Sequence, residues 1–189
     1  MLHRKRIRHV HEAGHLHELT FSCYDRLPLL TNDDWRRRLA RSIDAARAEC
    51  HMQLYAFVFM PEHVHLLVAP VGQGTISKFL ARIKQPFSKE IKARLAATRA
   101  KLFNRLTVVE RPGKTCFRFW QEGSGYDRNL YSPRAINTSI EYIHANPVAR
   151  GLCRKAVDWK WSASHYLEDG CLPDPDLPLL HPLPRDALM

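Results

Sequence analysis

QLYAFVFMPEHVHLLVA, residues 53–69, contains two runs of aromatic and β-branched residues separated by Pro61 and Glu62. Two such runs around a tight two-residue connection are typical of a β-hairpin. Their dense apolar content indicates central strands that are well covered by other parts of the chain. The segments on either side of the hairpin must therefore provide the layers that cover it.

Two amphipathic helices are predicted to provide that cover. Asn32 is a good N-cap, and behind it apolar residues recur at helical spacing up to Ala46, with arginines on the opposite face. After the hairpin, a second helix is expected from about Thr75 to Leu95, and Pro86 should kink or split it. Before the first helix, residues 15–24 alternate well enough to form a strand.

The remaining segments complete an α+β pattern. Residues 105–122 are predicted to be extended around a Pro112-Gly113 turn, and residues 123–125 to form a flexible loop. Ser132-Pro133 predicts a helix that ends just before Pro147. A short helix is expected over residues 162–168. The order of strands and helices predicts a ferredoxin-like antiparallel sheet with helices packed on it.

The composition divides the chain into three parts. Residues 1–12 form a basic N-terminal arm, residues 13–169 form one domain, and residues 170–189 form a tail that contains five prolines. Such a tail is expected to lie extended over the surface of the domain.

The charge of the chain favours a polyanionic partner. Lys and Arg total 29 against 19 acidic residues, which gives a net charge of +10 and a pI near 9.7. Nucleic acid is the commonest partner of such a protein, although a generically arginine-rich protein would look the same. The candidate DNA-binding side chains are Arg4, Lys5, Arg6, Arg37, Arg41, Lys78, Arg82 and Lys89.

Cysteine usage and hydropathy predict a cytoplasmic protein. The five cysteines are odd in number and form no C-x-x-C pair, which argues against a disulfide framework and for a reducing cytosol. The N-terminus lacks the apolar stretch of a signal peptide. Charged and histidine residues interrupt the longest apolar run, residues 54–70, so no membrane association is expected.

His63 and His65 are candidate metal ligands. Residues i and i+2 of a strand point to the same face, so both imidazoles would lie side by side while Val64 enters the other layer. Two such imidazoles can bind one divalent metal ion. The pattern alone is weak, because His15 and His17 repeat it in a strand where a structural role or a marginal DNA contact is the simpler reading.

A second group of polar residues lies on the helix that begins at Pro133. Ala135, Ser139, Tyr142 and Asn146 follow helical spacing and share one face beside the buried isoleucines. A phenol and an amide presented together can meet the two histidines across a cleft. Alternatively, Tyr142 is a tyrosine at the edge of the core and Asn146 ends the helix before proline.

Three motifs together resemble the REP-associated tyrosine transposases, which belong to the single-tyrosine branch of the HUH nucleases. They are FMPEHVHLLV (59–68), FRFWQ (117–121) and YIHANPVARGL (142–152), and the similarity spans roughly residues 13–167. The resemblance implies the ferredoxin-like HUH fold, with His63, His65 and Asn146 holding Mg²⁺ or Mn²⁺. It further implies that Tyr142 is the nucleophile. The expected activity is cleavage and rejoining of hairpin-flanked single-stranded DNA through a 5′-phosphotyrosine intermediate, by a monomer or a homodimer.

Two departures from the family pattern stand out. Residues 97–114 are longer than in compact members, and residues 123–130 lack a histidine found in many relatives. Trp120, Tyr126 and Tyr131 are candidates for stacking on unpaired bases, although Trp120 is equally suited to the core.

Two rival functions stay open. One is a catalytically inactive DNA-binding protein derived from a transposase. The other is a zinc-dependent hydrolase, for which the chain has no H-E-x-x-H motif.

Overall fold

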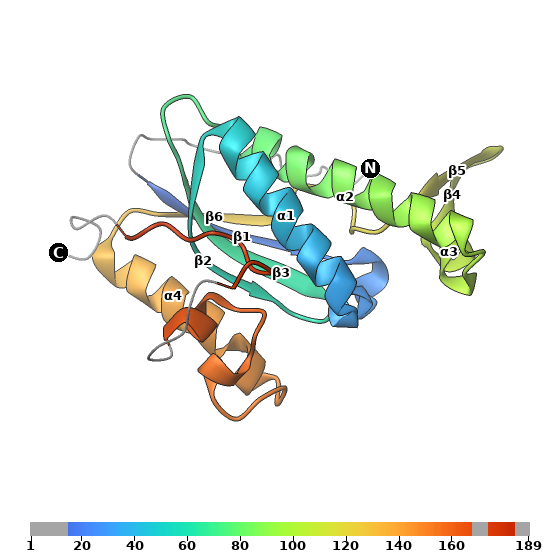
Figure 1. The fold of residues 1–189 in the computed structure, drawn as a ribbon. Helices are drawn as coiled ribbons and strands as arrows, with labels where there is room; N and C mark the ends of the chain where they lie inside the picture. The colour runs from blue at the N-terminus through green and yellow to red at the C-terminus, as the bar shows by residue number, and fades with distance from the viewer. Residues whose placement is uncertain (1–14, 168–173, 184–189) are drawn as a thin grey trace, which may run out of the picture.

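A four-stranded antiparallel sheet forms the centre of the protein (Figure 1). A computed structural model of the chain describes residues 15–167 and 174–183. The strand order in the sheet is β2-β3-β1-β6. The strands are β1 (Leu16–Ser22), β2 (Met52–Phe59), β3 (His63–Pro70) and β6 (Tyr126–Leu130). Helices α1 (Asp33–Cys50) and α2 (Ile76–Ala97) connect β1 to β2 and β3 to β6. This order confirms the predicted α+β, ferredoxin-like arrangement.

The register of the sheet assigns each side chain of β3 to one of two layers. Val64 lies opposite Phe21 of β1 and Phe59 of β2, whereas His65 lies opposite Thr20 and Val58. The face that carries Phe21 is covered by α1 and α2, since the Lys84 Nζ of α2 lies 5.1 Å from the Phe21 ring centroid. The face that carries His65 meets α4 (Pro133–Ala149), whose Tyr142 contacts the His65 ring. Helices therefore cover both faces of the sheet (Figure 1).

The predicted hairpin and first helix are confirmed. Every residue of β3 from His63 to Ala69 is buried, as expected of a central strand. The Asn32 side chain accepts a hydrogen bond from the backbone N–H of Trp35 at 3.1 Å, which caps α1. His51 adopts a left-handed conformation (φ 52°) at the end of α1, and it turns the chain directly into β2.

Both internal prolines are accommodated within helices, so Pro86 does not split its helix and the predicted helix end before Pro147 is wrong. Helix α2 runs without a break through Pro86, which is exposed, while Ile83 and Phe87 nearby are buried and hold the helix against the core. Helix α4 continues through Pro147 to Ala149 instead of ending before it. A proline removes only one donor near a helix end, and the burial of Ile143, Asn146 and Pro147 keeps this last turn packed.

The fourth strand of the sheet is not the one the sequence predicts. The extended segment 105–122 forms instead a separate ribbon of β4 (Thr107–Arg111) and β5 (Lys114–Phe117), which follows the short helix α3 (Lys101–Leu106). Figure 1 shows this ribbon projecting beyond the end of α2. The sheet is completed by β6, in a segment whose polar sequence resembles a loop because it forms an edge strand with alternating exposure.

Short 3-10 turns and the C-terminal segment close the remaining surface. The turns are η1 (Tyr24–Arg26), η2 (Leu29–Thr31), η3 (Ala156–Asp158) and η4 (Ala163–Leu167). The described part of the C-terminal segment lies along β2, where the His181 N–H donates to the Leu54 carbonyl at 2.7 Å. The predicted basic arm, residues 1–12, falls outside the described residues. Among those described, no helix is long and apolar enough to cross a membrane.

Gly125 brings β6 close to β1, and its replacement should damage the sheet. A Cβ at Gly125 would lie 2.1 Å from the Thr20 carbonyl oxygen, and the residue has φ +83°. Gly113 has a similar φ of +75° but open space around it. We expect Gly113→Ala to lower the free energy of unfolding by about 1–2 kcal/mol through backbone strain. Gly125→Ala should cost a further ~1–3 kcal/mol through overpacking, measured by urea denaturation. Equal losses for the two variants would contradict the close approach.

Candidate active site

A cleft of about 720 Å³ lies between the sheet and α4. Its floor is formed by the polar face of β1, β3 and β6, including Thr20, His63 and His65. Its wall is one face of α4, which contributes Tyr142 and Asn146. The structure therefore brings the two predicted groups, the H-x-H strand and the polar face of the helix, into a single cavity.

The two imidazoles face each other with their Nε2 atoms 3.0 Å apart. The His63 Nδ1–H donates to the Glu62 carboxylate at 3.2 Å, so that nitrogen carries the proton of the neutral ring. His65 Nδ1 lies 2.8 Å from the Thr20 hydroxyl. Because a hydroxyl can donate and accept, Thr20 supports either tautomer of His65. The Nδ1 atoms of both rings are thus held by hydrogen bonds, while both Nε2 atoms point into the cleft.

Burial keeps both rings neutral. Desolvation, with a smaller contribution from the neighbouring His63, lowers the pKa of His65 to about 3. Desolvation also lowers the pKa of His63, although the Glu62 carboxylate acts in the opposite direction. Neutral imidazoles retain the lone pairs that a metal ion requires.

The geometry of the histidine pair fits a divalent metal ion. Two adjacent ligands at about 2.1 Å from one ion, at right angles, are about 3.0 Å apart, which agrees with the distance between the two Nε2 atoms. In the part of the chain that the structure describes, no group of three or more His, Cys, Asp or Glu side chains could hold a metal ion. A third protein ligand from this cleft would therefore be an amide or a hydroxyl group.

Asn146 occupies a position from which it can provide a third metal ligand beside His63 and His65. Its side chain is 8% exposed and lines the cleft, and its Nδ2 donates to the Tyr142 carbonyl at 3.3 Å. That bond leaves Oδ1 as the atom able to bind a metal ion. Because α4 stays helical through Asn146 and Pro147, Asn146 remains one turn from Tyr142.

Tyr142 is held against the histidines and remains accessible. Its ring centroid lies 5.3 Å from that of His65 in an edge-on contact, and its side chain is 52% exposed. The helix that presents it begins where the Ser132 Oγ accepts the Ala135 N–H at 3.3 Å. A phenol with one side on the histidine pair and the other open to solvent can reach a molecule bound in the cleft.

Several polar side chains of the cleft were missed by the sequence analysis. Glu18 is buried and accepts a hydrogen bond from the Ser139 Oγ at 3.0 Å. Arg150 pairs with Glu62 at 3.0 Å, and this ion pair links the end of α4 to the strand that carries the histidines. Arg26 and Arg128 also line the cleft. They occur singly in a turn and in an edge strand, where no local pattern distinguishes them.

The predicted DNA-binding side chains do not join this site. Arg37, Arg41, Lys78, Arg82 and Lys89 lie on α1 and α2, on the other side of the sheet from the cleft. Two of them are paired with carboxylates, because Arg37 contacts Asp176 at 2.8 Å and Arg82 contacts Glu49 at 2.9 Å. Arg4, Lys5 and Arg6 lie outside the described residues.

The remaining candidates divide between structural roles and the surface. His17 is buried and lies 2.8 Å from Asp127, and His15 contacts Asn129, so this pair supports the edge of the sheet. Trp120 belongs to the aromatic core. Tyr126 and Tyr131 are exposed, and of these two Tyr126 lines the cleft.

The profile of the family described as "Transposase IS200 like" matches residues 13–109, slightly more than half of the chain. The chain belongs to the IS200-like transposase family. The matched region includes the H-x-H strand of the cleft, whereas Tyr142 and Asn146 lie beyond it.

One solved structure shares the fold of this chain over most of its length. A REP-associated tyrosine transposase bound to a REP hairpin is 21% identical, with a TM-score of 0.65, and the match covers 90% of this chain and 89% of that one. A proposed transposase of Deinococcus radiodurans R1 is 16% identical, with a TM-score of 0.44, over 76% of this chain and 97% of that one. None of the curated proteins compared with the chain matches it.

The Glu62–Arg150 ion pair should hold the last turn of α4 in place. Arg150→Met keeps most of the aliphatic length of the side chain and removes its charge. Because Arg150 is half-exposed, the loss of global stability should stay at about 1 kcal/mol or less. Amide hydrogen exchange at the C-terminal turn of α4 should nevertheless become faster, as measured by mass spectrometry. The control is Arg154→Met, which removes an exposed cation that forms no ion pair with any described residue. Unchanged exchange in Arg150→Met would show that the pair does not anchor the helix.

Proposed function

We propose that this IS200-like transposase is a metal-dependent enzyme that cuts and rejoins single-stranded DNA beside a hairpin, through a 5′-phosphotyrosine formed on Tyr142. The observation that carries the proposal is the contact of Tyr142 with His65, whose Nε2 atom lies 3.0 Å from that of His63. A nucleophile and a pair of metal-binding nitrogens thus share one accessible cleft.

His63, His65 and Asn146 would hold the metal ion, which we propose to be Mg²⁺ or Mn²⁺. When bound, such an ion polarises a phosphate and orients it for in-line attack. Imidazoles are softer ligands than Mg²⁺ prefers, so Mn²⁺ should support activity at least as well in vitro. Thr20 and Glu62 would keep the two rings in the orientation that ligation requires.

Tyr142 would perform the covalent step. Its phenolic oxygen attacks phosphorus, an O–P bond to the tyrosine forms, and the bond between phosphorus and the 3′ oxygen breaks to release a 3′-hydroxyl. The phosphotyrosine retains the energy of the original phosphodiester, so a second 3′-hydroxyl can reverse the step and join a new strand. Arg26 and Arg128 place positive charge beside the anionic substrate in the cleft.

Hairpin DNA is the proposed partner because of the charge of the protein and the nature of its structural neighbour. The net charge is +10, and the neighbour with the same fold is a transposase bound to a REP hairpin. An exposed tyrosine in the cleft, Tyr126, offers a stacking surface for an unpaired base.

Two other functions remain as alternatives. A DNA-binding protein without catalytic activity would have the same charge and fold, and only an assay for the covalent intermediate distinguishes it. A zinc hydrolase receives less support, because no group of three or more His, Cys, Asp or Glu side chains among the described residues could hold a metal ion.

Tyr142→Phe is the decisive variant. Wild-type protein incubated with Mn²⁺ and a labelled hairpin substrate should form a protein–DNA adduct that survives denaturation. The substitution removes one oxygen from a half-exposed ring, so folding and DNA binding should be preserved while the adduct disappears. Tyr126→Phe tests the other tyrosine of the cleft, and Tyr131→Phe is a control at an exposed site. If Tyr126→Phe alone abolished the adduct, the nucleophile would be Tyr126.

Metal binding should depend on the histidines and on their support. His63→Ala and His65→Ala should abolish Mn²⁺ binding, measured by calorimetry or electron paramagnetic resonance without DNA, and Asn146→Ala should weaken it. Thr20→Val removes the partner of His65 with little change of shape, and should lower the affinity about 10- to 100-fold. Thr20→Ser keeps the hydroxyl and should retain most of the wild-type affinity for Mn²⁺. Wild-type affinity in both single histidine variants would exclude this metal site.

A further inference from the structure

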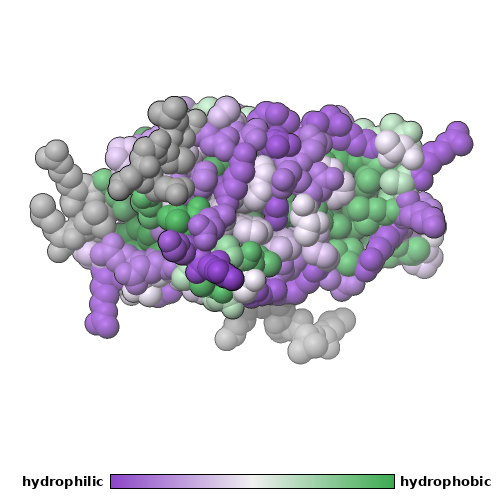
Figure 2. Space-filling view, turned by 60° about the horizontal axis from the view of Figure 1, so that its bottom comes forward, coloured by the Kyte–Doolittle hydropathy of each residue, from purple (hydrophilic) through white to green (hydrophobic). Residues whose placement is uncertain are grey.

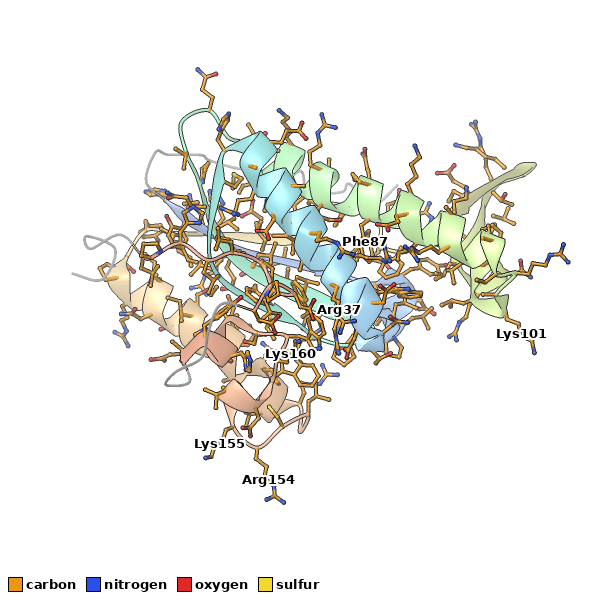
Figure 3. All side chains as sticks on the ribbon, viewed as in Figure 1. Arg37, Phe87, Lys101, Arg154, Lys155 and Lys160 are labelled. Atoms are coloured by element: carbon orange, nitrogen blue, oxygen red, sulfur yellow. The ribbon has the colours of Figure 1, made fainter. Side chains whose placement is uncertain are left out.

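Six of the eleven basic residues of the helix layer, defined here as α1 and α2, are neutralised by partners within the protein. These six residues are arginines that form ion pairs with carboxylates. One of the carboxylates, Asp176, belongs to the C-terminal segment. The pairs are Arg36–Asp33, Arg37–Asp176, Arg38–Asp34, Arg47–Asp44, Arg82–Glu49 and Arg94–Glu90, and Arg38 also contacts Glu90. Figure 3 shows Arg37 near Lys160, which shares Asp176 with it. This surface therefore offers less positive charge to a polyanion than its sequence suggests.

The ribbon, defined here as residues 98–118 with α3, β4 and β5, has a larger share of basic residues without a carboxylate partner. It contains six basic residues and one acidic residue. Arg99, Lys101, Arg105 and Arg111 form no ion pair with any residue in the described ranges, whereas Lys114 and Arg118 share Glu110. In Figure 3, Lys101 extends away from the body of the protein, and hydrophilic side chains project from the same end in Figure 2.

The base of the ribbon is attached to the edge of the cleft. Residues 117–121 lead from β5 back to the end of β1, where the Gln121 N–H donates to the Ser22 carbonyl at 2.8 Å. Ser22 itself lines the cleft, and the chain re-enters the cleft at Tyr126. DNA that leaves the active site at this end of the sheet would therefore meet the ribbon first.

We infer that the ribbon is a second DNA-binding site, which contacts the duplex stem of the hairpin while the cleft holds the adjacent single strand. A five-residue strand spans about 17 Å, which matches about five base pairs of duplex, or about ten phosphates counted on both strands. A two-stranded ribbon is also narrow enough to enter the major groove. This inference rests on the proposed function, because it takes a DNA hairpin as the substrate.

A second copy of the chain is the competing occupant. The two outer edges of a two-stranded sheet carry unpaired backbone groups that can extend a sheet in another molecule. The charge of the ribbon opposes that pairing, since two copies would bring like charges together. A duplex neutralises the same charge, so DNA is the occupant that we favour.

The test compares two triple variants with the same change of net charge. The ribbon variant is Lys101→Gln, Arg105→Gln and Arg111→Gln, and the helix-layer variant is Arg41→Gln, Lys78→Gln and Lys89→Gln. Binding to a labelled hairpin with a single-stranded flank is measured by fluorescence anisotropy without metal, across a salt titration. The ribbon variant should lose about tenfold or more in affinity. Its slope of log K against log salt should become shallower by up to about 3, because each lost phosphate contact contributes about 0.9.

Three outcomes would overturn the inference. They are an equal loss in the helix-layer variant, an equal loss for the single-stranded flank alone, and a change of oligomeric state in the ribbon variant with unchanged hairpin affinity. Light scattering of the same samples reports the oligomeric state. The adduct assay on wild-type protein tests the proposed function separately. A missing adduct with a selective loss of hairpin binding would leave the ribbon site standing and reject the nuclease.

Discussion

The alternation of side chains along β3 is the constraint on which both the core and the candidate site depend. Val64 enters the layer of α1 and α2, while His63 and His65 on either side of it enter the cleft under α4. A slip of one residue against β1 would put both imidazoles into the apolar layer and Val64 into the cleft. The burial of apolar residues that stabilises the sheet therefore also aligns the two nitrogens. The same strand needs Thr20 opposite His65, so β1 contributes to both functions as well.

Helix α4 brings Tyr142, which is distant in the sequence, into contact with that strand. Ile136 and Ile143 bury one side of the helix, and polar contacts tie its other side to the cleft. Ser139 bonds to Glu18 near the middle of α4, and Arg150 bonds to Glu62 just after its end. Glu62 also accepts a hydrogen bond from the His63 Nδ1–H, so one carboxylate joins the end of α4 to one of the two imidazoles. This shared partner makes the position of α4 and the orientation of His63 interdependent.

The features that could be predicted from the sequence are those written in local periodicity. The hairpin, the two amphipathic helices and the shared face of His63 and His65 follow from repeats of two or 3.6 residues, and the structure shows each of them. The strand β6 could not be predicted, because an edge strand with one solvated face has a polar sequence like that of a loop. The passage of α4 through Pro147 could not be predicted either, since it depends on packing by distant residues that outweighs a local preference. The pairing of Glu62 with Arg150 is a contact over 88 positions, and no local pattern contains it.

Net charge is the property for which sequence and structure differ most. A net charge of +10 indicates that a polyanion is attracted to the protein, but it does not indicate which surface would bind it. The densest run of arginines, in α1, is the part most fully occupied by carboxylates of the protein itself. A cation paired in this way releases no counterion from DNA unless its partner is first displaced, so it contributes little to affinity. Basic side chains without such partners, on the ribbon and at the cleft, keep their full electrostatic attraction for phosphate groups. The site at which this protein would attract a polyanion therefore depends on which of its basic residues lack an acidic neighbour, and that requires the tertiary structure.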